Sequence, residues 1–251
     1  MWPIDDRVWC AKRPYHSPCQ DYGAVVKGDD LCALIVADGV GGCWRSELAS
    51  ETAALGLRSR LISRDALRHF SDAKSIARVL VDLTKEIRER ALREPGRPDG
   101  VWPATTLIAV IYERRSGELW LFYAGDGTVW FIRGDRQEGM PLLLPTANRA
   151  GGLLHILYPQ ASDPQPVVMR IGNVRAWPGG GLIIIGTDGV PLSDPRGLVD
   201  RLYKWLRGQC ESESDLGAEI QQWLDEQRIS DDATLGVLLP KVTQEWWERE
   251  R

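Results

Sequence analysis

The chain has 251 residues, of which 43% are hydrophobic and 26% charged. The length would fit one large domain or two small ones, and the composition is typical of a soluble globular protein that can bury a full core. A net charge of −4, without a basic stripe, argues against nucleic acid as a partner. The longest apolar stretches are far too short to span a bilayer, so we expect no membrane partner. The five cysteines show no C-x-x-C pairing, which disfavours a zinc site. Their odd number and the lack of a signal peptide predict reduced thiols in the cytoplasm.

Hydrophobic periodicity and turn residues predict alternating groups of strands and helices. In chain order we expect strands at 7–11, 24–26 and 31–37, helices at 46–63 and 72–93, strands at 106–112, 119–123, 129–133, 167–171 and 182–186, helices at 195–207 and 215–227, a strand at 234–239 and a short helix at 241–251. Residues 135–165 are rich in Pro, Gly and Ala and lack a clear period. Hairpins interrupted by two pairs of helices indicate a single α+β domain with two sheets between helical layers.

Short acidic motifs stand at the ends of several expected strands. Asp38-Gly39, Gly125-Asp126 and Asp188-Gly189 each follow an apolar run, and Asp231-Asp232 precedes one. A single Asp-Gly pair is usually a turn, but turns alone do not explain this ordered series. Carboxylate oxygens suit Mg²⁺ and Mn²⁺, and glycine lets backbone and water come close. The motifs therefore predict convergence on hard cations.

The order and spelling of these motifs resemble the type 2C (PPM) family of metal-dependent protein phosphatases, and in one loop a bacterial-type subgroup of it. The likeness runs from Gln20 to Leu239. It is carried by the segments CQDYGAV, VADGVGGCWRSELAS, PATTLIAVIY, LWLFYAGDGTVWFIRGD, LIIIGTDGV and SDDATLGVLL. The resemblance implies an αββα sandwich, in which two antiparallel sheets are flanked by helix pairs and a metal cleft lies at one end. It places a divergent flap-like segment at 135–165.

The resemblance also implies roles for the acidic residues. Asp38 would bridge two core Mn²⁺ or Mg²⁺ ions, and the carbonyl of Gly39 would join one of them. Asp188 and Asp231 would ligate the second ion, and with Asp38 they would form the catalytic set. Asp126 matches a third, weaker metal position that it would share with Asp188.

Two further acids are implied to support this centre. Asp21 would hold metal-bound water from outside the ligand shell. Asp232 occupies a position where the family has Asn or Asp, and it would brace the site.

The chain departs from the family pattern where the substrate phosphate is bound. The family commonly has an Arg about five residues before Asp21, and here that residue is His16. A neutral imidazole binds phosphate weakly and cannot form the forked contact of a guanidinium. We therefore consider His16 and Arg13 as substrate-binding candidates, and a loop residue without a role remains an alternative for His16. Residues 145–149 also depart from the flap sequence, so the flap gives no prediction of substrate.

The leading hypothesis is a metal-dependent protein serine/threonine phosphatase in cytoplasmic signalling, which hydrolyses phosphoserine and phosphothreonine with a water activated by two metal ions. No G-x-S-x-G or C-x₅-R motif is present, so a covalent intermediate is not expected. A phosphoprotein substrate and a cognate Ser/Thr kinase are the expected partners. The main alternative is a weak or inactive phosphatase-like module that binds a kinase or phosphoprotein. A small-molecule phosphatase and an anti-sigma-factor regulator on the same fold stay open.

Overall fold

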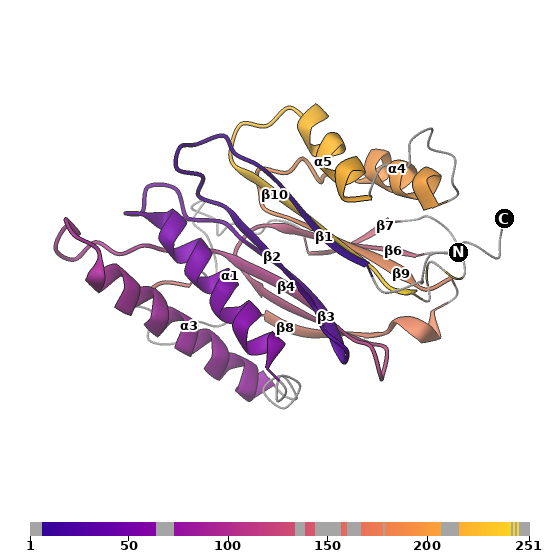
Figure 1. Ribbon diagram of the computed structural model, residues 1–251, viewed down its shortest axis with the longest axis horizontal. Helices are drawn as coiled ribbons and strands as arrows, with labels where there is room; N and C mark the ends of the chain where they lie inside the picture. Colours follow the sequence, from indigo (N-terminus) through magenta and orange to yellow (C-terminus); the bar gives the residue numbers. More distant parts are fainter. Residues whose placement is uncertain are drawn as a thin grey trace.

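The computed structural model describes residues 7–63, 73–133, 139–143, 157–159, 167–177, 179–206, 216–241, 243 and 245. Within these residues, ten strands form two five-stranded sheets, and four helices cover them in two layers (Figure 1). Among the described helices, none combines the length and apolar character needed to cross a membrane.

All paired strands in both sheets run antiparallel. The first sheet has the order β1 (Arg7–Arg13), β10 (Ala233–Leu239), β9 (Gly181–Gly186), β6 (Thr128–Arg133) and β7 (Gly139–Leu143). The second has the order β2 (Tyr22–Lys27), β3 (Leu31–Ala37), β4 (Leu107–Glu113), β5 (Glu118–Ala124) and β8 (Val167–Asn173). The helices are α1 (Ser46–Ile62), α3 (Ala73–Arg93), α4 (Arg196–Leu206) and α5 (Leu216–Glu226), and a 3₁₀ turn spans Val174–Ala176.

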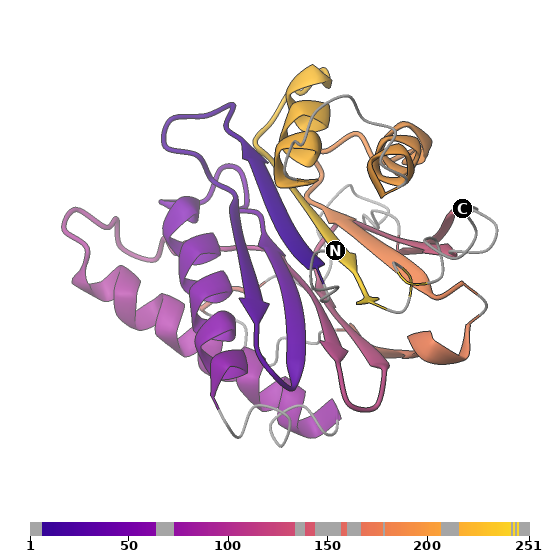
Figure 2. The same cartoon turned by 45° about the vertical axis from the view of Figure 1, so that its right-hand side comes forward.

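The two helical layers lie on opposite outer faces of the sandwich. Helices α1 and α3 cover the sheet that contains β2, β3 and β4, and α4 and α5 cover the sheet that contains β1 and β10 (Figures 1 and 2). Strand β3 is apolar along its whole length because all seven of its residues are buried. Ala33 and Ile35 pack toward the α1–α3 side, whereas Leu34 and Val36 pack between the sheets. Alternate side chains thus enter different cores.

Small residues set two of the closest approaches in the fold. A Cβ atom at Gly56 would lie 2.6 Å from Cδ2 of Leu83, so glycine lets α1 and α3 cross closely. A Cβ atom at Gly236 would lie 2.5 Å from Cδ1 of Leu34, where the two sheets meet. Both distances are below any ordinary carbon–carbon contact, and larger residues would push the layers apart.

The predicted αββα architecture is confirmed, and the expected elements up to 239 recur with ends shifted by a few residues. The sequence interpretation missed β7, which lies within 135–165. Among the described strands it pairs with β6 alone, and it contains Pro141 and leaves Met140 54% exposed. An edge strand with a proline shows little of the alternation on which strand prediction depends. Most of the expected helix at 241–251 and most of the flap-like segment lie outside the described residues.

Candidate metal centre

Three of the predicted metal ligands meet at one end of the sandwich. Asp38 follows β3, Asp126 follows β5 and Asp188 follows β9. Each offers a carboxylate oxygen, and these oxygens lie within 4.8 Å of one another. Strands β3 and β5 belong to one sheet and β9 to the other. The cluster is therefore assembled across the two sheets, and its geometry depends on their packing.

The backbone of Asp38 is fixed by the threonine pair that precedes β4. Its N–H donates to Oγ1 of Thr106 at 3.1 Å. Its carbonyl oxygen accepts from Oγ1 of Thr105 and from the N–H of Thr106, both at 2.8 Å. These bonds satisfy both polar backbone groups of Asp38 within the protein, and so its carboxylate is aimed from a rigid support.

Glycine is required beside two of the acids by close backbone contacts. A Cβ atom at Gly39 would lie 2.7 Å from the carbonyl of Ser46, at the start of α1. A Cβ atom at Gly189 would lie only 1.9 Å from the carbonyl oxygen of Asp232. The N–H of Gly39 also donates to the carbonyl of Gln20 at 3.1 Å. Glycine therefore follows Asp38 and Asp188 because the loops around these acids pack too tightly for a larger residue.

Asp21 lies beneath the cluster and is 1% exposed. Its Oδ2 accepts a hydrogen bond from Oγ1 of Thr187 at 2.6 Å, and the ammonium of Lys12 donates to its carbonyl oxygen. Burial raises the pKa of Asp21 to about 6, although the hydrogen bond from Thr187 opposes the rise. Within the described residues its Oδ1 is buried without a hydrogen-bond partner.

The carboxyl groups of the cluster resist ionisation together. Burial raises the pKa of Asp38 well above its usual range, and the neighbouring charges of Asp21, Asp188 and Asp126 raise it further. Burial and then the charge of Asp188 raise the pKa of Asp126 to about 6. Burial raises the pKa of Asp188 as well, and the charge of Asp231 adds to the effect. A cation among these oxygens would remove both the repulsion and the desolvation penalty.

The residues fit a divalent cation of the kind that the sequence predicts. In the described part of the chain, Oδ1 of Asp126 is a second buried carboxylate oxygen without a partner, after Oδ1 of Asp21. Buried acceptors without donors are costly unless water or an ion completes them. Because the donors here are all carboxylate oxygens, the set suits Mg²⁺ or Mn²⁺.

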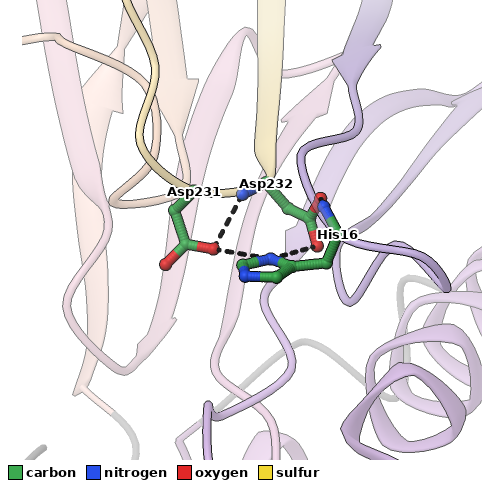
Figure 3. A group of neighbouring side chains, drawn as sticks. All are labelled: His16, Asp231 and Asp232. Carbon is green, nitrogen blue, oxygen red and sulfur yellow. Dashed lines mark hydrogen bonds and ion pairs between the residues drawn. The ribbon is translucent and has the colours of Figure 1, made fainter.

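Asp231 joins a second group instead of this cluster. Nδ1 of His16 lies 3.2 Å from Oδ1 of Asp231 and 3.3 Å from Oδ2 of Asp232. Figure 3 shows the imidazole between the two carboxylates. The charge of Asp231 still acts on Asp188, so the second group adjoins the first. Of the proposed metal ligands, Asp38, Asp126 and Asp188 thus form one group, and Asp231 lies in the neighbouring group with His16 and Asp232.

Asp232 holds the loop that carries His16. Its Oδ1 accepts from the N–H groups of Tyr15 at 2.5 Å and His16 at 2.9 Å, and its Oδ2 accepts from the N–H of Gln20 at 2.6 Å. Burial opposes its ionisation, but these backbone donors outweigh burial, and the pKa of Asp232 is lowered. The side chain is fully buried. This arrangement fits the bracing role proposed for Asp232.

The structure does not bring the side chain of Arg13 to the acids. Strand β1 continues to Arg13, and the guanidinium donates to the carbonyls of Leu224 and Gln227 at the end of α5. Free carbonyls at a helix C-terminus are natural partners for an Arg side chain. The interpretation of Arg13 as a substitute phosphate ligand is therefore not supported by its position, and His16 is the remaining candidate.

Sequence reasoning missed the threonines that support the acids. Thr187 holds Asp21, and Thr105 and Thr106 hold Asp38. Each lies within a segment that carries the family resemblance, so its position was visible in the sequence. Its partner was not, because the hydrogen bonds join residues 67 to 166 positions apart.

Comparison with protein families shows to which family the chain belongs. The family described as Protein phosphatase 2C matches residues 13–226, and the chain belongs to this family. Its fold is that of the bacterial PPM serine/threonine phosphatases. No curated protein sequence compared with the chain matches it.

Solved structures agree with this fold along most of the chain. The serine/threonine phosphatase of S. agalactiae superposes with a TM-score of 0.68 at 16% identity, covering 94% of this chain and 99% of its own. The PPM Ser-Thr phosphatase MsPP from Mycobacterium smegmatis, solved with cacodylate, gives 0.63 at 20% identity, with coverage of 93% and 98%. The catalytic domain of the phosphatase PstP, solved with two manganese ions, gives 0.63 at 18% identity, with coverage of 93% and 97%.

Proposed function

We propose that this chain is a metal-dependent protein phosphatase that hydrolyses phosphoserine and phosphothreonine in phosphoproteins. The observation that carries the proposal is the group of oxygens from Asp38, Asp126 and Asp188, which lie within 4.8 Å of one another at the meeting point of the two sheets. Membership of the phosphatase family supports the reaction class. The two manganese ions of PstP support Mn²⁺ as a cofactor, and Mg²⁺ has the same ligand preference.

The role that we propose for each residue follows from its position in the site. Asp38, Asp126 and Asp188 would hold cations, with Asp231 and the carbonyl of Gly39 as further ligands at the edge of the group. When bound, the cations would lower the pKa of a water molecule and neutralise phosphoryl oxygens. Asp21, fixed by Thr187, would orient water from below. His16, on the rim with a side chain 42% exposed, would contact the substrate phosphate.

The proposed biological setting follows from the reaction. A phosphatase acting on phosphoserine and phosphothreonine requires phosphoprotein substrates, and a Ser/Thr kinase must supply them. We place this exchange in cytoplasmic signalling. A non-catalytic member that binds phosphoproteins would have little use for carboxylates that raise one another's pKa, because they destabilise the fold when no cation is present.

The test is hydrolysis of a phosphothreonine peptide by the full chain with Mn²⁺, with Mg²⁺ and with chelator. We expect turnover with either cation and none with chelator. Asp38→Asn should abolish turnover, because the substitution removes a charge from the centre of the group. Asp99→Asn is the matched control, since Asp99 is an exposed acid, and it should keep full turnover. No hydrolysis by the wild-type chain with either cation would reject the proposal in favour of a binding module.

A further inference from the structure

The group formed by His16, Asp231 and Asp232 differs from the main cluster because it contains a nitrogen donor. Each residue offers one ligand atom, and these atoms lie within 4.8 Å of one another. His16 enters from the loop between β1 and β2, and the two acids from the segment before β10 (Figure 3). Side chains from two distant parts of the chain thus converge on one point.

Asp232 is unsuited to bind an ion directly. Its oxygens already accept three backbone N–H groups, from Tyr15, His16 and Gln20. Its Oδ2 also lies 3.3 Å from Nδ1 of His16, so the carboxylate uses about four lone-pair positions and has little capacity left for a cation. Asp232 instead fixes the backbone of His16, and this places the imidazole beside Asp231. The remaining ligand candidates in this group are the carboxylate of Asp231 and Nδ1 of His16, which a cation would draw away from its contact with Asp232.

The spacing of these two donors matches that of neighbouring ligands of one ion. Ligands about 2.1 Å from a cation lie about 3.0 Å apart in octahedral and about 3.4 Å apart in tetrahedral coordination. Nδ1 of His16 and Oδ1 of Asp231 are 3.2 Å apart, between these values. Both side chains are partly open, at 42% and 50% exposure, so an ion with its remaining water ligands can enter. Asp231 also adjoins Asp188 of the main cluster, whose pKa its charge raises.

We propose that His16 is a nitrogen ligand, through Nδ1, of the cation that Asp231 holds at the edge of the metal centre. This inference rests on the proposed function, because it concerns a cation of the same centre. A neutral imidazole that binds the cation through Nδ1 carries its single proton on Nε2, and the bond to the cation replaces the contacts of Nδ1 with Asp231 and Asp232. The functional consequence is metal selectivity. Imidazole nitrogen favours transition-metal ions, whereas Mg²⁺ prefers oxygen ligands alone.

The experiment measures the ligand atom itself. The full chain is prepared with natural and with ¹⁵N-labelled histidine and saturated with Mn²⁺, and electron spin-echo envelope modulation is recorded on the bound ion. We expect modulation from a directly bound histidine nitrogen in the wild type and its loss in His16→Ala. The matched control is Tyr15→Phe. The ring of Tyr15 packs edge-on against the imidazole of His16 and its N–H binds Asp232, and Phe keeps both contacts, so this variant should keep the signal.

Calorimetry supplies a second readout that does not depend on activity. In His16→Ala, we expect the Kd for Mn²⁺ to rise by at least about tenfold and the Kd for Mg²⁺ to change much less. The loop should stay in place, because Asp232 holds its backbone, and an unchanged melting temperature in chelator checks this. Absence of histidine modulation from the Mn²⁺-loaded wild type, or its persistence in His16→Ala, would overturn the inference.

The failure of this inference can be told apart from the failure of the proposed function. If Mn²⁺ binds and the phosphopeptide is hydrolysed without a histidine nitrogen on the ion, only the inference is wrong. If the wild type binds neither Mn²⁺ nor Mg²⁺, the metal centre does not exist and both are wrong.

Discussion

Thr187 donates its hydroxyl hydrogen to Oδ2 of Asp21 at 2.6 Å and so links the end of β9 to a carboxylate 166 positions earlier. The same hydroxyl oxygen accepts the N–H of Thr234 at 2.9 Å. One buried side chain therefore ties together the loop before β2, the end of β9 and the start of β10. These are the segments that carry Asp21, Asp188 and Asp231. The spacing between the acids depends on this threonine.

Replacement of this threonine gives the first prediction. Thr187→Val removes the donor to Asp21 and the acceptor for Thr234 while keeping the shape of the side chain. We expect a loss of about 1–3 kcal/mol in the free energy of unfolding, since buried polar groups are left unpaired, and a weaker affinity for Mn²⁺. Thr187→Ser keeps the hydroxyl and should stay close to the wild type. Urea denaturation and calorimetric Mn²⁺ titration measure the two effects. Equal behaviour of the Val and Ser variants would contradict the argument.

The same residue shows where sequence reasoning succeeds and where it stops. Asp38, Asp126 and Asp188 could be predicted because each follows an apolar run and stands beside glycine, which are local signals. The contact between Thr187 and Asp21 could not, because it depends on how two distant loops meet. Arg13 shows the same limit. The absence of the family's Arg suggested Arg13 as a substitute, whereas its guanidinium donates to carbonyls at the end of α5.

A second kind of prediction follows from the raised pKa values of the cluster. The pKa of an Asp carboxyl is about 3.9 in the unfolded chain, whereas in the folded chain Asp21 and Asp126 each have a pKa of about 6. Between these values the folded state binds more protons than the unfolded state, so the free energy of unfolding falls as pH rises. With chelator present, we therefore expect stability to decrease from pH 4 to above pH 6. Mn²⁺ should reverse the decrease, because it binds the ionised carboxylates.

Removing one acid from the cluster tests the same electrostatics at a single pH. In chelator at pH 7.5, Asp126→Asn should raise the melting temperature, by about 2–4 °C for each kcal/mol of repulsion relieved. Asp99→Asn, at an exposed position, should leave it unchanged. With Mn²⁺ present, the order should invert, since Asp126→Asn loses a ligand. Thermal melts recorded by circular dichroism compare the wild type and both variants, each with chelator and with Mn²⁺. A lower melting temperature for Asp126→Asn in chelator would count against electrostatic strain in the cluster.

Asp232 should behave in the opposite way, because its pKa is lowered in the folded state. Its bracing effect is present above the unfolded pKa of about 3.9 and is lost as pH falls through the folded value. Asp232→Ala leaves the N–H groups of Tyr15, His16 and Gln20 without their acceptor, and we expect a loss of about 3 kcal/mol or more at pH 7. Asp232→Asn keeps one acceptor oxygen and should lie between Ala and the wild type.

Hydrogen exchange localises this effect. In Asp232→Ala the amides of Tyr15, His16 and Gln20 should exchange much faster than in the wild type, while those of β3 should change only with global stability. The differences in stability among the three proteins should shrink as pH falls through the lowered pKa of the folded state, because the carboxylate becomes protonated there. A gap that stays constant with pH would show that the ionised form of Asp232 does not act as the brace.

The close approach of Gly189 to Asp232 gives the last prediction. A methyl group at Gly189 would lie 1.9 Å from the carbonyl oxygen of Asp232, and backbone cannot move aside as a flexible side chain can. Gly189→Ala should therefore cost about 1–3 kcal/mol of stability and weaken Mn²⁺ binding, because Asp188 is displaced from Asp231. Gly41→Ala is the matched control. It lies in the neighbouring motif with nothing within 4 Å of its added methyl group, and a change within about 0.5 kcal/mol is expected. If both variants bind Mn²⁺ as tightly as the wild type, the contact between these loops does not set the geometry of the metal centre.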